Sequence, residues 1–259
     1  MEDSLKNFET KQPKQYKEVS VTSSKFIGRV FLYTFIALGI TAVVAAIIGL
    51  VFSRAIQPVD YNYTEFVIDI NLIQPYLYLL IGSIVVYIPT IIWIHIVAFR
   101  GKGRLDIPFV LYAIIMGVLI SSFTMFVPIE VIAISFGITC LVFGLLALIG
   151  LTAKRDLSFL GLVAMGIFFG ALLVALFNII WSLIFPGSFQ MLYWVVSYAI
   201  FLAMMLITIF DVWRVKKIAQ RGEQTTNVAL YCAFNLYVDF IYIFIRILGL
   251  VASFYSRGK

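Results

Sequence analysis

Two aspartates in the last third of the chain are the residues whose type and position could do chemistry. Asp211 lies at the end of an apolar stretch, residues 190–213, and Asp239 lies inside the next one, residues 228–253. An ionisable side chain at membrane depth costs roughly 3 kcal/mol on insertion scales, and such residues usually have a function. We therefore take this acidic pair as the candidate site.

Two carboxyl groups that meet where water is scarce can form a switch. Desolvation and mutual repulsion favour the protonated form of at least one of them, so the pair can share one proton. A shared proton ties the two helices together by a hydrogen bond. Without it, the repulsion amounts to about 4 kcal/mol at about 4 Å and an effective dielectric constant near 20. The hypothesis is a cation path that protonation closes, with Asp211 and Asp239 as pH sensor and gate.

Other polar residues of the last stretch lie on the same helical stripe as Asp239. Asn235 precedes Asp239 by four residues and Arg246 follows it by seven. Asn235 would be a polar support and Arg246 a charge partner. The alternative is that Asp211 is only interfacial and that Arg246 neutralises Asp239. Carboxylates that face a wet cavity are also hard oxygen ligands, so Asp211 and Asp239 are possible calcium ligands.

The composition defines the scaffold as an all-α membrane protein. The chain is 63% hydrophobic and 12% charged, whereas soluble domains are about 25% charged. Apolar stretches long enough to span a bilayer recur from residue 26 onward. Seven spans are expected, at residues 26–52, 75–99, 107–127, 129–152, 157–185, 190–213 and 228–253. This predicts a disordered cytoplasmic tail (1–25), a seven-helix domain (26–254) and a short C-terminal tail (255–259).

Charge and small residues refine this arrangement. Alternate connections place fifteen Lys and Arg residues on the side of the N-terminus and one, Arg54, on the other side. The positive-inside rule then predicts a cytoplasmic N-terminus. A full crossing by the last span leaves the C-terminal tail outside, so a re-entrant last segment is the alternative.

Glycines at 137, 144, 166 and 170 predict close helix packing within the bundle, with homodimerisation as the alternative.

Three segments resemble the transmembrane Bax inhibitor motif family, also called the Bax inhibitor-1 family. They are ITCLVFGLLALIGLTAKRDLSFLG, FLAMMLITIFDVWRVKKI and ALYCAFNLYVDFIYIFIRILG. The first contains Thr152, Lys154 and Asp156 at a short turn. The second ends its span with Asp211, and the third contains the Asn235-to-Asp239 pattern. The resemblance implies that six helices enclose the central C-terminal helix.

The same resemblance implies a function. It predicts a pH-sensitive calcium-permeable leak, gated by Asp211 and Asp239. An arginine near the cytoplasmic end of the second span can latch such a pair, and Arg100 is the candidate. We expect calcium only as the permeant ion, no cofactor, a lipid bilayer as surroundings, and a bacterial plasma membrane as location.

Two other classes of function remain as alternatives. A non-conducting protein could modulate other membrane proteins by interaction. An intramembrane aspartyl protease also has one aspartate on each of two spans, but its flanking motifs are absent around Asp211 and Asp239. His95 is the single histidine, which excludes a bis-histidine haem site and a zinc site with several histidines. We therefore expect no enzymatic activity.

Overall fold

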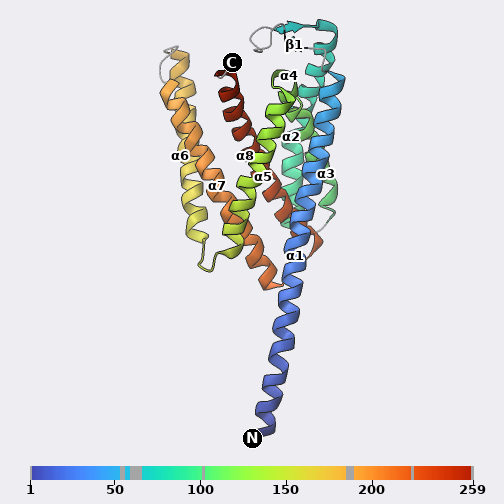
Figure 1. The fold of residues 1–259 in the computed structure, drawn as a ribbon, viewed down its shortest axis with the longest axis vertical. Coiled ribbons are helices and arrows are strands. Elements are labelled where there is room, and N and C mark those ends of the chain that lie inside the picture. The colour runs from blue at the N-terminus through green and yellow to red at the C-terminus, as the bar shows by residue number, and fades with distance from the viewer. Residues whose placement is uncertain are drawn as a thin grey trace. The chain divides into compact units, whose positions relative to one another are not determined.

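The protein is a set of long apolar helices. The computed structural model describes residues 2–52, 56–58, 66–100, 103–184, 190–222 and 225–257. The helices are α1 (Glu2–Val51), α2 (Ile70–Arg100), α3 (Asp106–Ile120), α4 (Phe123–Phe126), α5 (Ile129–Thr152), α6 (Ser158–Ile184), α7 (Gln190–Arg221) and α8 (Thr226–Arg257). Two short strands, β1 (Ile56–Pro58) and β2 (Phe66–Ile68), pair antiparallel, with Ile56 opposite Ile68. In Figure 1 the ribbon colour runs from blue at the N-terminus to red at the C-terminus, so the elements can be followed in chain order.

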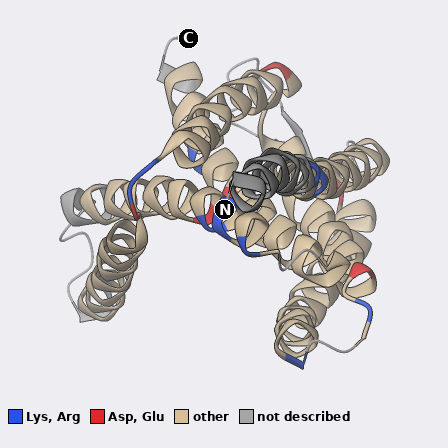
Figure 2. Cartoon of the chain, turned by 90° about the horizontal axis from the view of Figure 1, so that it is seen from below, with Lys and Arg blue, Asp and Glu red and all other residues tan. Residues whose placement is uncertain are grey.

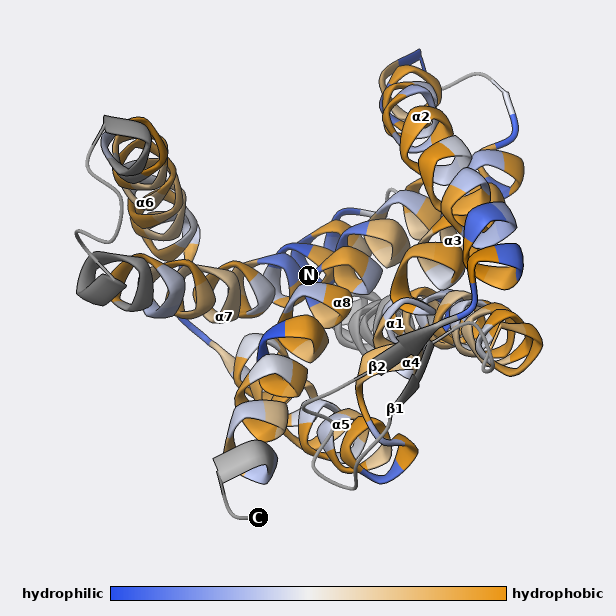
Figure 3. Ribbon diagram, turned by 90° about the horizontal axis from the view of Figure 1, so that it is seen from above, coloured by the Kyte–Doolittle hydropathy of each residue, from blue (hydrophilic) through white to orange (hydrophobic). Residues whose placement is uncertain are grey.

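Seven helical segments in the described residues are long and apolar enough to cross a membrane, as the sequence predicts. Hydrophobic residues dominate the helices in Figure 3, and charged residues are sparse along the ribbons in Figure 2. A helix satisfies its backbone hydrogen bonds within one segment, which is why apolar sequence of this length forms helices in lipid. The fold class is therefore an all-helical, multi-pass membrane protein.

The ends of several elements differ from the expected boundaries. Helix α1 begins at Glu2, well before the expected start of the first span at residue 26, and the disorder of the tail stays a prediction. The tail is rich in Lys, Glu and Gln, which favour helix, and extending an existing helix avoids the cost of nucleation. At the other end, α8 is one continuous helix to Arg257, which includes most of the expected C-terminal tail. A re-entrant last segment would need a break, and α8 has none.

The third span consists of two helices. The hydroxyl groups of Ser121 and Ser122 donate to the carbonyl oxygens of Val118 and Leu119, at 2.6 and 2.7 Å. Such bonds compete with the backbone ladder, so α3 ends there and α4 adds one turn. Val127 is extended (φ −125°, ψ 129°), as expected for the residue before Pro128.

The helices form two compact units, which we describe separately. The first unit contains Met1–Pro128 and Arg214–Tyr237, and the second contains Ile129–Trp213 and Val238–Lys259. In the first unit, α3 packs against both α1 and α2. The α1–α3 contact is close at Gly117, where an added Cβ atom would lie 2.7 Å from Val44 Cβ. Glycine is required there because the helix backbones approach each other directly.

Hydroxyl groups link helices inside the first unit. Thr41 Oγ1 donates to the Ala113 carbonyl oxygen at 2.9 Å and lies 2.7 Å from the Tyr237 hydroxyl group. Thr34 Oγ1 lies 3.2 Å from the Ala233 carbonyl oxygen. These contacts connect α1 with α3 and with the first part of α8. The rings of Phe109, Tyr112, Phe234 and Tyr237 pack edge to face beside them.

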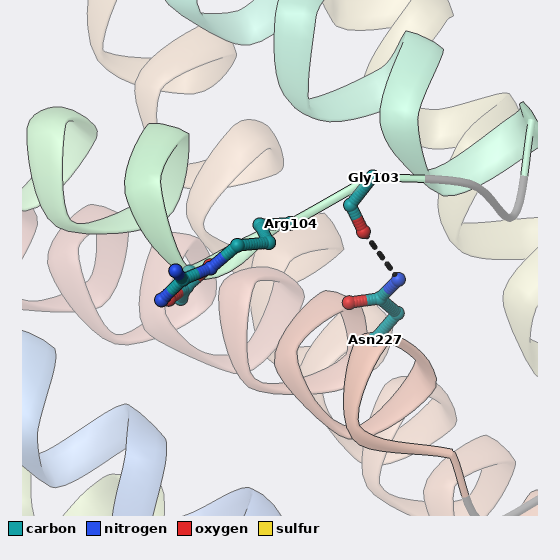
Figure 4. Close-up of polar contacts among 4 residues, drawn as sticks. Gly103, Arg104 and Asn227 are labelled. Atoms are coloured by element: carbon teal, nitrogen blue, oxygen red, sulfur yellow. Dashed lines mark hydrogen bonds and ion pairs between the residues drawn. The ribbon is translucent and has the colours of Figure 1, made fainter.

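Short polar contacts order the turn between α2 and α3. Asn227, near the start of α8, donates from Nδ2 to the Gly103 carbonyl oxygen at 2.9 Å (Figure 4). Gly103 has a φ of 110°, a region that favours glycine. Arg104 forms an exposed ion pair with Asp106 at 2.7 Å, and this carboxylate raises the pKa of the Arg104 guanidinium.

The second unit is held together by rings and by two glycines. Phe240 of α8 packs against Phe136 and Phe143 of α5, with ring centroids 5.6 and 5.4 Å apart. An added Cβ atom at Gly150 would lie 2.7 Å from the Ile209 carbonyl oxygen, and one at Gly161 would lie 2.9 Å from the Phe210 ring. Glycine therefore allows α5 and α6 to approach α7 closely.

Four other glycines, whose spacing predicts close helix packing, do not have this role. An added Cβ atom at Gly137, Gly144, Gly166 or Gly170 would meet no atom within 4 Å in the described part of the chain. The prediction of close packing within the bundle is therefore wrong at these four positions. Spacing shows that glycines share a helix face, but not whether that face meets another helix.

Candidate functional site

Both candidate aspartates belong to the second unit. Asp211 lies on α7, ten residues before its end, and is half-buried. Asp239 lies on α8, thirteen residues after Thr226, and its side chain is 3% exposed. At about 1.5 Å per residue, Asp239 is about 20 Å along the helix axis from the start of α8. The acidic group of Asp239 is thus well inside a membrane-spanning segment.

The carboxyl groups of Asp211 and Asp239 lie close enough to interact electrostatically. Asp211 is an electrostatic neighbour of Asp239, and the Thr208 side chain is a hydrogen-bond partner of Asp239. Thr208 is fully buried, and its hydroxyl also lies 2.8 Å from the Met204 carbonyl oxygen on the same helix. A hydroxyl group has one proton, so Thr208 can donate either to the Asp239 carboxyl group or to the Met204 carbonyl oxygen.

One oxygen of Asp239 has no hydrogen bond. Asp239 Oδ2 is buried and forms none with any residue that the structure describes. A buried polar atom without a partner costs free energy, and the cost is larger for an ionised group. The carboxyl group can remove this cost by taking up a proton, by admitting water or by binding a cation. Asp239 thus has one buried oxygen atom that remains open to a hydrogen bond or a positive charge.

The backbone around Asp211 is fixed by the two close glycine contacts. Ile209, Phe210 and Val212 flank Asp211, and these three residues contact the positions of Gly150 and Gly161. Val212 is fully buried. The segment of α7 that presents Asp211 is therefore held against both α5 and α6, at the ends of these helices that flank their short connection.

The expected partners of the pair occupy different places. Arg246 of α8 donates from Nη1 to Ser197 Oγ of α7, and no described carboxylate lies within ion-pair distance of it. The alternative in which Arg246 neutralises Asp239 is therefore wrong for this structure. Arg100 is the exposed last residue of α2, in the first unit, and Asn235 is half-buried in the same unit. Their roles as latch and polar support stay predictions.

Sequence reasoning missed two side chains that complete this part of the unit. Thr208 precedes Asp211 by three residues, a spacing that places both on one helix face. That spacing could have identified Thr208. Ser197 carries no comparable signal, because its partner Arg246 lies on another helix and forty-nine residues away.

The acidic pair alone forms an incomplete cation site. Among the described residues, no group of three or more His, Cys, Asp or Glu side chains could hold a metal ion. Calcium in a tight site takes six to eight oxygen ligands, so two carboxylates with water would bind it weakly. The described residues therefore do not form a tight calcium site.

Fold and site together define a multi-pass helical membrane protein with an acidic pair on its last two spans. Residues 23–256 match the model of the family "Inhibitor of apoptosis-promoting Bax1", and the chain belongs to this family, as its motifs predict. The chain is 28% identical over 180 residues to the inner membrane protein YbhL of Escherichia coli (strain K12). This match covers 67% of the chain and 74% of YbhL. YbhL of Escherichia coli O6:H1 matches to the same extent.

Proposed function

We propose that the protein is a pH-dependent, calcium-permeable leak in a bacterial plasma membrane, with Asp211 and Asp239 as proton sensor and gate. The observation that carries the proposal is the buried Asp239 carboxyl group, which has an unpartnered Oδ2 atom and a second carboxyl group as its electrostatic neighbour. The similarity to an inner membrane protein of Escherichia coli supports the proposed location.

The direction of the pH effect follows from the charges. At low pH the pair holds at least one proton, repulsion is small, and α7 and α8 can remain together. As pH rises the last proton leaves, and the two negative charges repel by about 4 kcal/mol at about 4 Å and an effective dielectric constant near 20. Separation of the helices then admits water and a divalent cation, so calcium flux increases with pH.

Proteoliposomes that contain a calcium-sensitive dye test this proposal. Calcium flux into the vesicles is measured between about pH 5.5 and 8 for the wild type, Asp211→Asn, Asp239→Asn and Asp106→Asn. Asparagine has the shape of aspartate but does not change its charge in this range. Asp106 is an exposed carboxylate in the first unit and serves as the matched control.

The outcomes separate the candidate functions. We expect flux that increases with pH in the wild type and in Asp106→Asn, and flux that does not respond to pH in both other variants. The leak proposal fails if flux is independent of pH, or if Asp211→Asn and Asp239→Asn keep the response of the wild type. A protein that acts only by interaction would give no flux. A protease would cleave a model transmembrane peptide and lose this activity in either asparagine variant.

A further inference from the structure

Arg246 lines a pocket that neither Asp211 nor Asp239 lines. The pocket has a volume of about 200 Å³ and lies between α7 and α8 in the second unit. Its polar lining residues include Ser197 and Arg246, and Phe201, Ile245 and Leu250 contribute apolar side chains. The remaining lining residues are Tyr198 and Gly249.

In the described residues, one hydrogen bond uses the N–H donors of the Arg246 guanidinium group. This group donates to Ser197 Oγ, and no carboxylate of the described residues lies within ion-pair distance of it. Guanidinium has five N–H donors in a planar fork that matches the oxygens of a phosphate or carboxylate group. The Ser197 hydroxyl accepts from Arg246, so its own proton remains available for an anion. Charged side chains inside a membrane usually have a partner, and no described carboxylate pairs with Arg246.

Ser197 and Arg246 lie in the halves of their helices that include the start of α7 and the end of α8. Ser197 is seven residues after the start of α7 at Gln190, and Arg246 is nine residues before Tyr255, near the end of α8. Nine residues correspond to about 14 Å, and the flexible arginine stem lets the charged end reach toward the interface. The sequence around Ser197 also contains Tyr193, Trp194 and Tyr198, residue types that gather at membrane interfaces.

The rest of the pocket suits a lipid more than a free ion. Tyr198 is 52% exposed, and an added Cβ atom at Gly249 would meet no atom within 4 Å, so the pocket opens outward on that side. The apolar side chains next to Arg246 could pack against the first carbons of an acyl chain or a glycerol backbone. An anion held at Arg246 would thus have an apolar continuation beside it.

We propose that Arg246 and Ser197 form a binding site for a phosphate-type oxyanion, supplied by the headgroup of an anionic lipid. The lipid would bridge α7 and α8 on the opposite side of Asp239 from the start of α8. Bound there, it would stabilise the contact between the two helices that contain the acidic pair. The site is independent of whether the protein conducts calcium.

Native mass spectrometry of the purified full-length protein in detergent tests the site. Phosphatidylglycerol and phosphatidylcholine are added in turn, and the retained lipid is counted for the wild type, Arg246→Gln, Gly249→Leu and Arg221→Gln. Arg221 is an exposed arginine at the end of α7, in the first unit, and is the matched control. Gly249→Leu fills the pocket and leaves Arg246 intact. In a parallel experiment, inorganic phosphate is added to the same four proteins and thermal unfolding is measured.

We expect Arg246→Gln to bind phosphatidylglycerol about tenfold more weakly, the effect of losing one charge-assisted contact. Gly249→Leu should weaken it similarly, whereas Arg221→Gln should bind as the wild type does, and no protein should prefer phosphatidylcholine. Stabilisation by inorganic phosphate that requires Arg246 would also support the oxyanion site and would identify a free ion as its ligand.

The proposal is overturned if both lipids are retained equally and phosphate has no effect. It is also overturned if Arg246→Gln and Arg221→Gln lose binding to the same extent. If Arg246→Gln does not fold, Gly249→Leu decides: unchanged preference for phosphatidylglycerol in that variant rejects the pocket.

Discussion

At the scale of single residues, the main feature is the Thr208 hydroxyl group, which lies within hydrogen-bond distance of two acceptors. Thr208 can donate to the Met204 carbonyl oxygen or to Asp239, and it is the hydrogen-bond partner that the structure shows for this buried carboxyl group. A hydrogen bond from a neutral donor stabilises a carboxylate more than a carboxylic acid. Thr208 therefore assists the ionisation of Asp239, which is the step that the proposed gate requires.

Removing this hydroxyl should shift the pH response of the leak. Thr208→Val keeps the shape of threonine but cannot donate to Asp239, so the rise in calcium flux should move to higher pH. Thr208→Ser keeps the hydroxyl and should respond as the wild type does. The measurement is vesicle calcium flux against pH. A midpoint that is equal in Thr208→Val and Thr208→Ser would show that the hydroxyl does not act on the gate.

At the scale of helices, two glycines set how closely α7 is held. Gly150 of α5 and Gly161 of α6 contact the backbone and side chains on either side of Asp211. Gly166 and Gly170 form a GxxxG pattern five and nine residues further along α6, and an added Cβ atom at either would meet nothing within 4 Å in the described residues. The same residue type thus has a packing role in one place and none in another.

Alanine substitutions should separate these two kinds of glycine. Gly150→Ala places a methyl group 2.7 Å from the Ile209 carbonyl oxygen, a backbone atom that cannot move alone, and should destabilise the protein by about 2 kcal/mol. Gly166→Ala is the control. It meets no neighbour and should be neutral or stabilise the helix by up to about 1 kcal/mol. Thermal unfolding in detergent measures both, and equal effects would mean that α5 and α7 do not approach each other at Gly150.

At the scale of the whole molecule, the distribution of charge determines orientation. With seven crossings, fifteen Lys and Arg residues fall on the side of the N-terminus and three, Arg54, Arg257 and Lys259, on the other side, and this asymmetry predicts a cytoplasmic N-terminus. Seven crossings then place the connection between α7 and α8 in the cytoplasm and the start of α5 outside. The pocket at Arg246 would face the outer leaflet in this orientation.

Single cysteines can test the orientation in intact cells. Cys140 and Cys232 both lie in helices and are first replaced by alanine. A membrane-impermeant maleimide should then label Glu130→Cys, at the start of α5, and should label Gln220→Cys only after the cells are opened. Both positions are exposed, so accessibility in the folded chain does not limit the reaction. Labelling of Gln220→Cys in intact cells would reverse the orientation.

The sequence by itself determined the membrane class, the seven spans and the two aspartates. Hydrophobicity and charge act locally, since each apolar stretch must form a helix in lipid whatever its neighbours are. The aspartates were identifiable for the same reason, because a charge inside an apolar stretch is costly wherever that stretch packs.

Only the tertiary structure decided which residues meet. In the folded chain Asp211 interacts electrostatically with Asp239, and Arg246 donates a hydrogen bond to Ser197. Close helix contacts occur at Gly150 and Gly161 and not at Gly166 and Gly170. These choices depend on the rotation and depth of each helix relative to its neighbours. In lipid, many helix faces are almost equally apolar, so the sequence pattern leaves that rotation open and specific packing and hydrogen bonds determine it.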